Sequence, residues 1–150
     1  MSINDHHVIV SRILNQQIQV VLATLDINEL CQHLMAYGFS DDLTMIYLAS
    51  YSHTRKVRNM RATPSISLLW DNRTGHIRDH NKGYCLTAQG EAKELVKCEA
   101  TVAKLSLHAR SPNTEAMLKN KSVVFFSISV CQYVLARGSD EVETYRPNAQ

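Results

Sequence analysis

Short apolar runs, each bounded by polar or glycine-containing turns, constrain the fold of this chain more than any other feature of its sequence. The runs occupy residues 20–25, 31–39, 43–50, 65–70, 84–96, 122–130 and 131–137. Their lengths and their content of β-branched and aromatic residues predict six or seven β-strands. Strands this short and this numerous favour an antiparallel sheet that closes into a small barrel, because closure removes the open sheet edges.

Helical spacing of apolar residues is confined to segments before and between the strands. Residues 2–19 and 98–110 show this spacing, which predicts two amphipathic helices. Thr54 is a candidate N-cap for a short helix that Pro64 ends, because the residue before a proline is pushed out of the helical region. Residues 111–120 begin with a serine and a proline and predict a further short helix. The fold class expected from these elements is α+β.

Turn residues and glycines predict how the strands connect. The polar turn at residues 40–42 separates two apolar runs, so the runs at 31–39 and 43–50 are expected to pair as a hairpin. Gly90 lies inside a predicted strand, where a glycine often marks a bulge. The charged segment after residue 137 is expected to fray.

Length and charge limit the class of protein. A chain of 150 residues is long enough for a substantial core, so residues 1–150 are expected to form a single domain. The formal net charge of +2 is far below that of a dedicated nucleic-acid-binding protein, so no nucleic-acid partner is expected. Any cationic binding site must therefore be local.

Cysteine spacing and the N-terminal sequence bear on cellular location. The cysteines at 31, 85, 98 and 131 form no CxxC pair, which predicts reduced thiols and neither a zinc site nor a disulfide scaffold. The sequence MSINDHHVIV has an acidic residue and histidines where a secretory signal carries basic residues. We therefore expect a cytoplasmic protein with no membrane association.

The sequence SYSHTRK, residues 50–56, leads into a segment with four basic residues and no acidic one. A helix N-terminus offers unpaired backbone N–H groups and a partial positive charge. Thr54, Arg55 and Lys56 would add a hydroxyl, a forked cation and a mobile cation, which together suit a phosphate monoester. One alternative is a solvated basic helix face. Another is nucleic-acid contact through Arg55, Arg58 and Arg61, which the modest net charge disfavours.

Several elements around this segment follow one another in a recognisable order. Ser50 ends an apolar strand, Thr54-Arg55-Lys56 follows, Asn59 stands in the short helix, and a turn precedes the next strand at Pro64. The later sequence LTAQGEAKEL, residues 86–95, contains a Gly-Glu-Ala element. This order resembles that of the pyridoxamine 5'-phosphate oxidase-like FMN-binding split-barrel family, whose members have a strand-end threonine, a Ser-x-Lys element, an asparagine and an Asn-Pro turn. The resemblance covers residues 8–96 well and the remainder by element order.

The resemblance implies an antiparallel six- or seven-stranded split β-barrel with flanking helices, and a homodimer that holds FMN at its interface. Carried over to this sequence, Thr54, Arg55 and Lys56 would contact the FMN phosphate, and Ser50 would lie beside the ribityl chain. The flavin ring would lie along Leu34, Met35, Ala36 and Tyr37, with Trp70 nearby. The implied function is flavin-dependent oxidation or reduction of a small-molecule substrate, with the reactive group supplied by the cofactor.

Departures from the family pattern leave alternatives open. By our register the oxidase has cations where this chain has Leu34 and Phe39, and a glutamine where it has Cys85. These differences argue against oxidation of pyridoxamine phosphate itself. A flavin or haem carrier without turnover is the alternative, and His53 keeps haem possible because related haem-binding proteins have histidine in comparable turns. No metal site is expected, since the histidine pair at 76 and 80 lies in a turn-rich loop.

Overall fold

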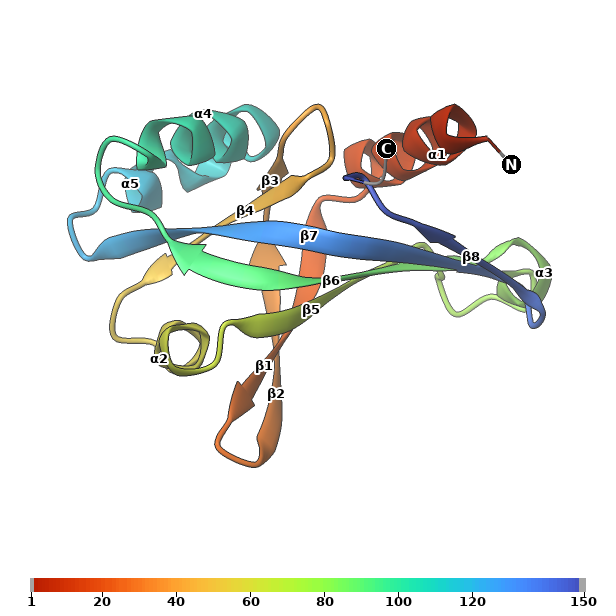
Figure 1. The fold of residues 1–150 in the computed structure, drawn as a ribbon, viewed down its shortest axis with the longest axis horizontal. Coiled ribbons are helices and arrows are strands. Elements are labelled where there is room, and N and C mark those ends of the chain that lie inside the picture. Colours follow the sequence, from red (N-terminus) through yellow and green to blue (C-terminus); the bar gives the residue numbers. More distant parts are fainter. Residues whose placement is uncertain (1, 149–150) are drawn as a thin grey trace.

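One antiparallel sheet of eight strands forms the body of this computed structural model, which describes residues 2–148 (Figure 1). In chain order the elements are α1 (Ile3–Gln16), β1 (Gln19–Asp26), β2 (Glu29–Ala36), β3 (Gly38–Phe39), β4 (Met45–Tyr51), α2 (Arg55–Ala62), β5 (Ser65–Asp71), α3 (Asp79–Lys82), β6 (Tyr84–Glu94), α4 (Ala100–Arg110), η1 (Pro112–Thr114), α5 (Glu115–Leu118), β7 (Val123–Arg137) and β8 (Glu141–Tyr145). The strand order is β2-β1-β5-β6-β7-β4-β3, and β8 pairs with β7.

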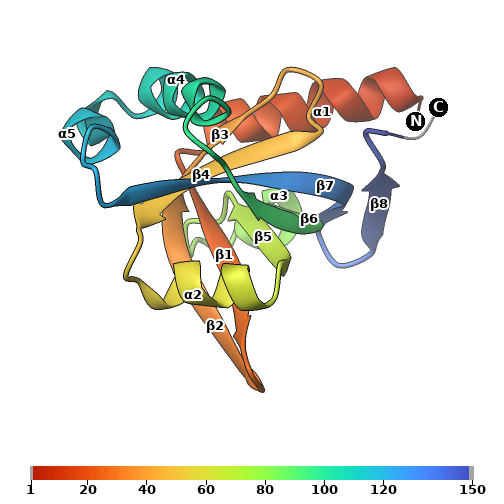
Figure 2. The same cartoon turned by 60° about the vertical axis from the view of Figure 1, so that its left-hand side comes forward.

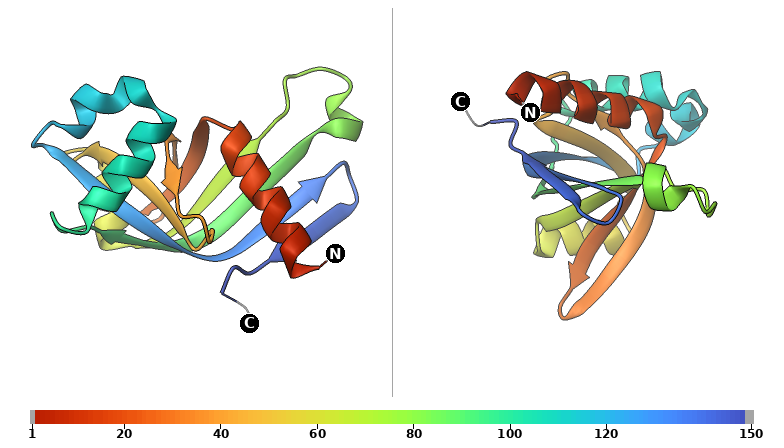
Figure 3. Two further views of the ribbon diagram at one scale, coloured as in Figure 1. Left: turned by 90° about the horizontal axis from the view of Figure 1, so that it is seen from above. Right: turned by 90° about the vertical axis from the view of Figure 1, so that its right-hand side faces the viewer.

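The two ends of this sheet are joined by the chain itself. Strands β2 and β3 are the first and last strands of the order, yet only Tyr37 separates them in the sequence. The sheet must therefore curl until its ends meet, which gives the open-sided barrel seen in Figure 3. The predicted α+β fold with an antiparallel split barrel is confirmed.

The expected hairpin between residues 31–39 and 43–50 forms only in part. Residues 29–36 pair along their whole length with β1, from Gln19 opposite Ala36 to Asp26 opposite Glu29. Only Gly38 and Phe39 pair with β4. The run breaks at Tyr37, whose ring is fully buried. The single hydroxyl proton of Tyr37 is shared between the carbonyl oxygens of Leu14 and Gln17 at the C-terminal end of α1, 2.7 and 2.8 Å from the hydroxyl oxygen.

Two predictions for the C-terminal part were wrong. The runs at 122–130 and 131–137 form one strand, because the residues where they meet, Val130 and Cys131, provide no turn. The tail does not fray throughout, because β8 pairs with the second half of β7. Gly138 has a φ of 55°, which supplies the turn between them, and Tyr145 anchors β8 by stacking on Tyr133 with ring centroids 6.1 Å apart.

Other local predictions are confirmed. The register between β6 and β7 shifts at Gly90, and a Cβ there would collide with the carbonyl oxygen of Ser129, so the bulge requires glycine. Helices form near residues 2–19, 98–110 and 111–120, although the last is divided into η1 and α5. The polar loop after β5 also contains the single turn of α3.

The hydrophobic core has two parts. The larger fills the curl of the sheet, and its largest fully buried side chains are Trp70, Tyr37, Tyr133 and Phe126. The smaller lies between α4, α5 and the start of β7; we call it the α4 core, and it consists of Ala49, Ala100, Ala103, Leu107, Leu118, Val123 and Phe125. Helices α1 and α4 lie on one side of the sheet, whereas α2 lies on the other, beside the β1–β2 hairpin (Figures 1 and 2).

Residues 2–148 include no helix that is both long enough and apolar enough to cross a lipid bilayer.

Candidate functional site

Helix α2 begins where the sequence predicted an anion site. Thr54 is the residue at its N-cap, but its hydroxyl does not cap the helix. Instead the hydroxyl donates to the carbonyl oxygen of Tyr51, 2.9 Å away, and contacts the hydroxyl of Ser50 at 3.0 Å. The side chain that would ordinarily satisfy the first turn is therefore turned back toward the preceding strand.

The first turn of α2 consequently keeps its hydrogen-bond donors. Within the described part of the chain, the first helix amide with an intrahelical acceptor is that of Arg58, 3.2 Å from the carbonyl oxygen of Thr54. The amides of Arg55, Lys56 and Val57 precede it and are left for water or an external acceptor. Their direction and the helix dipole favour an anion at this end of α2.

A buried polar network fixes α2 to the sheet. Asn59 and Thr24 are each only 2% exposed, and the amide of Asn59 donates to the hydroxyl of Thr24 at 3.0 Å. The same hydroxyl lies 3.3 Å from Nε2 of His33 on β2. Because buried polar groups are costly to leave unpaired, this network holds α2, through its second turn, and the inner face of β2 in one arrangement.

Arg55 is oriented by two carboxylates of the β1–β2 turn. Its Nε donates a hydrogen bond to Asp26 at 2.8 Å, and one of its terminal nitrogens donates another to Glu29 at 2.7 Å. The hydrogen bond from Arg55 lowers the pKa of Asp26, and the reciprocal bond raises the pKa of Arg55. A guanidinium has five N–H donors, so three remain for another acceptor. The side chain of Glu29 is 76% exposed, so this second ion pair is a weak one that a phosphate can replace.

Lys56 adds a second cation beside Arg55, and His33 lies close to both. Within residues 2–148 Lys56 forms no hydrogen bond or ion pair through its side chain. Burial lowers the pKa of His33, and the positive charges of Lys56 and Arg55 lower it further. Cys31 shares the inner face of β2 with His33, and its Sγ lies 3.8 Å from the carbonyl oxygen of Glu29, whose carboxylate pairs with Arg55. We call Cys31, His33, Thr54, Arg55 and Lys56 together the α2 corner.

Sequence reasoning missed His33. The register taken from the family resemblance placed Leu34, and not His33, where the related oxidase has a cation. In the structure Leu34 is 63% exposed and points away from the core, whereas Cys31, His33 and Met35 share the inner face of β2. Taking Met35 as a core residue would have revealed this face, because side chains two apart on a strand point the same way.

The residues predicted to surround the flavin ring are only partly accessible. Met35 is buried, Tyr37 is fully buried, and Trp70 is 1% exposed in the main core, where its ring lies 5.5 Å from that of Tyr37. Ala36 is half-buried, and Leu34 alone presents a large exposed side chain. The proposed ring contact stays a prediction, in which this strand would contribute its backbone and Leu34.

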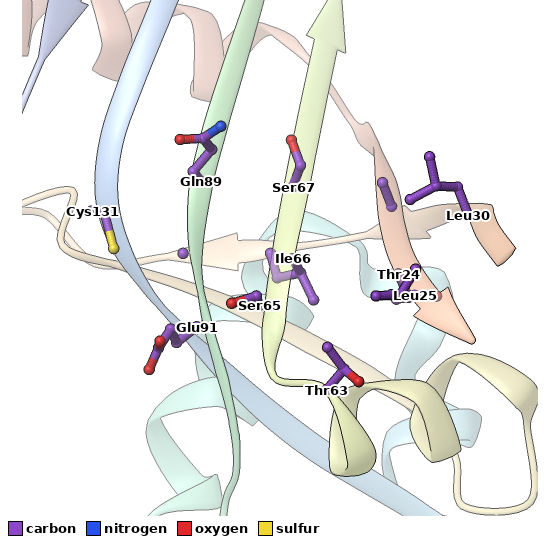
Figure 4. Close-up of a pocket in the computed structure, with 12 residues that line it drawn as sticks. Thr24, Leu25, Leu30, Thr63, Ser65, Ile66, Ser67, Gln89, Glu91 and Cys131 are labelled. Atoms are coloured by element: carbon purple, nitrogen blue, oxygen red, sulfur yellow. The ribbon is translucent and has the colours of Figure 1, made fainter. Parts of the chain in front are cut away.

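A hollow of about 420 Å³ lies beside the other end of α2 (Figure 4). It opens on the outer face of the sheet, and its lining includes Leu25, Leu30, Ser67 and Gln89. Thr63 closes it at the C-terminal end of α2. None of the residues of the α2 corner lines it, so the hollow and the corner are separate features on either side of the β1–β2 hairpin.

Other cationic and histidine candidates are accounted for locally. Arg58 pairs with Asp26 at 3.3 Å, and Arg61 forms a forked pair with Glu94 at 2.7 and 2.8 Å. Histidine 53 is exposed and lies beside Tyr51, with ring centroids 6.0 Å apart. Among residues 2–148, no three His, Cys, Asp or Glu side chains converge in a metal-binding group.

Solved structures share this fold at low sequence identity. A haem-binding protein from Mycobacterium smegmatis matches 91% of this chain with a TM-score of 0.78 and 14% identity, and this chain spans 56% of its length. An FAD-binding protein from Mesorhizobium loti matches 88% of this chain with a TM-score of 0.69 and 18% identity, and the match covers 94% of the length of that protein. A putative pyridoxamine 5'-phosphate oxidase from Listeria innocua matches 85%, with 95% of its own length, a TM-score of 0.69 and 16% identity.

At these identities the structural matches establish the fold alone. No curated protein sequence matches the chain significantly. The family model described as pyridoxamine 5'-phosphate oxidase, however, matches residues 10–135, which include β1 to β6, all but the last two residues of β7, and the whole α2 corner. The chain therefore belongs to the pyridoxamine 5'-phosphate oxidase family.

Proposed function

We propose that this protein is a homodimeric FMN-binding protein that acts as a flavin-dependent oxidoreductase on a small molecule. The FMN phosphate would lie in the α2 corner. The observation that carries the proposal is the open first turn of α2, whose unpaired amides lie beside Arg55 and Lys56. Backbone donors, a helix dipole and two cations at one point are a combination that suits a dianionic phosphate ester.

The residues present fit such a group. Arg55 is held in place by Asp26 and still has three N–H donors, so it would bind phosphate without first being ordered. Lys56 is free to move toward the ligand. Ser50 is 5% exposed and hydrogen-bonded to Thr54, so it stabilises the turn between β4 and α2.

The β1–β2 hairpin supports a dimer. It extends beyond the rest of the fold (Figures 1 and 2) and carries Ile27 and Leu30, each 84% exposed, together with Leu34. Ile27 has a φ of 55°, a left-handed conformation that β-branched residues rarely adopt. An exposed isoleucine in a strained turn is explained if a second copy of the chain covers it, and an isologous contact would bury the same face of both hairpins.

Bound FMN would supply hydride or electron transfer at its ring. The protein would anchor the phosphate through α2 and orient the ring along β2. A partner subunit would exclude water from the ring, so dimer formation and activity should be lost together. The substrate is expected to be a small molecule that stacks on the exposed ring face.

Titration of the purified protein with FMN tests the proposal. The double variant Arg55→Ala/Lys56→Ala should bind FMN at least about 100-fold more weakly, because each lost charged hydrogen bond costs about 1.5–3 kcal/mol. The matched control is Arg58→Ala/Arg61→Ala, which removes the same charge from the same helix away from its first turn. Equal FMN affinity in wild type and the first variant would refute the assignment, and NAD(P)H oxidation with added FMN separates an enzyme from a carrier.

A carrier of flavin or haem without turnover is the second candidate. It is supported by the structural similarity to the Mycobacterium smegmatis haem-binding protein and by the exposed His53 in the turn before α2. The visible spectrum of the purified protein distinguishes the two ligands. A Soret band that disappears in His53→Ala would favour haem, whereas a flavin spectrum unaffected by that change would favour FMN.

A further inference from the structure

A second hollow lies in the α4 core, separate from the α2 corner. It has a volume of about 570 Å³ and opens between α4, α5 and the first residues of β7. Its floor is apolar and includes the buried side chains of Ala100, Leu118, Val123 and Phe125. This volume lies within the range of about 300–1,000 Å³ that is typical of small-molecule sites.

Four lysines, Lys97, Lys104, Lys119 and Lys121, stand around this floor, and no acidic residue lines it. The whole chain has a net charge of only +2, so the rest of the molecule sums to −2. Lys119 pairs with Glu115, whereas among the described residues Lys97, Lys104 and Lys121 form no ion pair. The positive charge is therefore concentrated at the hollow and is largely uncompensated there.

One lysine at the edge of the hollow contacts its apolar floor directly. The ammonium of Lys104 lies 5.1 Å from the centre of the Phe125 ring, so it is held over the aromatic surface. The backbone of Phe125 is fixed, because its carbonyl oxygen accepts from the amide of Leu95 at 2.8 Å, and its ring is buried in the α4 core. Cation and apolar surface thus lie within the reach of one small molecule.

We propose that this hollow, which we call the lysine pocket, binds an amphipathic organic anion. The ligand class is an aromatic or short aliphatic body with a single carboxylate, sulfonate or phosphate group. The body lies on Phe125 and Leu118, and the anionic group lies among Lys97, Lys104 and Lys121. A purely inorganic anion leaves the apolar floor unused, and an uncharged ligand leaves the lysines without a counter-charge.

The shape favours a small molecule over a macromolecule. The cations surround a concave apolar floor, whereas a nucleic acid needs a cationic surface that follows an extended backbone. The arginines of α2 lie on the other side of the sheet (Figure 1) and are paired with Asp26 and Glu94.

Fluorescence titration with 8-anilinonaphthalene-1-sulfonate tests the proposal, because this aromatic anion emits strongly in apolar surroundings. The folded wild type should bind one equivalent, and added salt should weaken binding. The variant Lys97→Gln/Lys104→Gln should bind about tenfold more weakly. The uncharged analogue N-phenyl-1-naphthylamine should bind to wild type more weakly than the sulfonate does. Its affinity for wild type and for Lys97→Gln/Lys104→Gln should be the same. These exposed substitutions leave the core intact, and thermal melting verifies that the variant is folded.

Two matched controls locate the site. Lys82→Gln removes a lysine from α3, and Lys56→Gln removes one from the α2 corner; both should keep wild-type affinity for the sulfonate. Equal affinity in wild type and Lys97→Gln/Lys104→Gln would overturn the proposal, as would a loss confined to Lys56→Gln. A single-stranded oligonucleotide that displaces the probe through the same lysines would also overturn it, in favour of a nucleic-acid surface.

Discussion

Helices α1 and α2 both begin at a hydroxyl residue, yet their first turns are satisfied in opposite ways. In α1 the Ser2 hydroxyl accepts from the amide of Asp5 at 3.2 Å, and the Asp5 carboxylate accepts from the amide of Ser2 at 3.0 Å. In α2 the hydroxyl of Thr54 is bound to the strand before it, and no such reciprocal pair forms.

The difference depends on the residue three positions after the cap. Asp5 closes the box in α1. The corresponding residue in α2 is Val57, which is fully buried and has no acceptor. A helix that caps itself has no need of a ligand, whereas α2 keeps donors for one. An uncapped helix start beside cations is therefore a better indication of an anion site than the cations alone.

The largest effect on FMN affinity is expected when a carboxylate is introduced at the N-cap of α2. In Thr54→Asp a carboxylate would occupy the N-cap and accept from the first-turn amides, as the Ser2 hydroxyl does in α1. FMN should then bind at least about 100-fold more weakly, while the free energy of unfolding should rise by up to about 1 kcal/mol. FMN titration and urea denaturation measure the two changes.

Thr54→Ser is the control for that variant, since it keeps the hydroxyl without adding charge. It should alter neither FMN affinity nor stability appreciably. If Thr54→Asp keeps wild-type FMN affinity, the first turn of α2 does not hold the phosphate.

The C-terminal end of α1 is also satisfied from within the protein, by Arg110, and this contact should contribute to the free energy of unfolding. The guanidinium of Arg110 donates to the carbonyl oxygens of Leu14 and Gln17, each 2.7 Å away, and to that of Tyr37 at 3.1 Å. It also stacks over the Tyr37 ring, 4.6 Å from its centre. Arg110→Ala should lower the free energy of unfolding by about 3 kcal/mol in urea denaturation, because buried carbonyls lose a charged donor. Arg12→Ala on the exposed side of α1 should have almost no effect.

A smaller loss is expected from the N-terminus of α1. Ser2→Ala removes the cap and should cost about 1 kcal/mol of stability. Ser2→Asn should restore most of it, because asparagine is an equally good cap. Neither change should affect FMN binding. A Ser2→Ala protein as stable as wild type would show that the capping box does not contribute to folding.

Much of the fold could be predicted from local sequence. Turn residues and apolar runs located most strands, and Gly90 marked the bulge because no other residue fits against Ser129. The errors came from long-range contacts. The break at Tyr37 depends on hydrogen bonds to α1, and β8 depends on the packing of Tyr145 against β7. Neither contact leaves a signal in the residues around it.

The candidate site could be predicted only where it is contiguous in sequence. Thr54, Arg55 and Lys56 adjoin one another, so their common location followed from the start of a helix. His33 and Thr24 reach the same place from β2 and β1 through a strand register that the sequence does not specify. The pairing of Arg55 with Asp26 was equally hidden, since β2, β3 and β4 separate the two residues in the sequence.

The smallest effect concerns the titration of His33. Its pKa is lowered by burial and by the charges of Lys56 and Arg55, so the folded protein holds this proton less tightly than the unfolded chain. The neutral form therefore contributes full stability above the ordinary pKa of 6.5, and that contribution is lost as the pH falls below it toward the folded pKa. His33→Gln should flatten the dependence of unfolding free energy on pH in this window.

NMR titration of His33 also reports on the ligand and completes the comparison of the two helices. A phosphate bound at α2 supplies a negative charge beside Lys56 and Arg55, so FMN should raise the pKa of His33 toward its ordinary value. Lys56→Gln should raise it in the absence of FMN, because one of the two lowering charges is gone. Ser2→Ala should not move it. If saturating FMN leaves the pKa of His33 unchanged, the phosphate binds elsewhere, and the open turn of α2 requires another explanation.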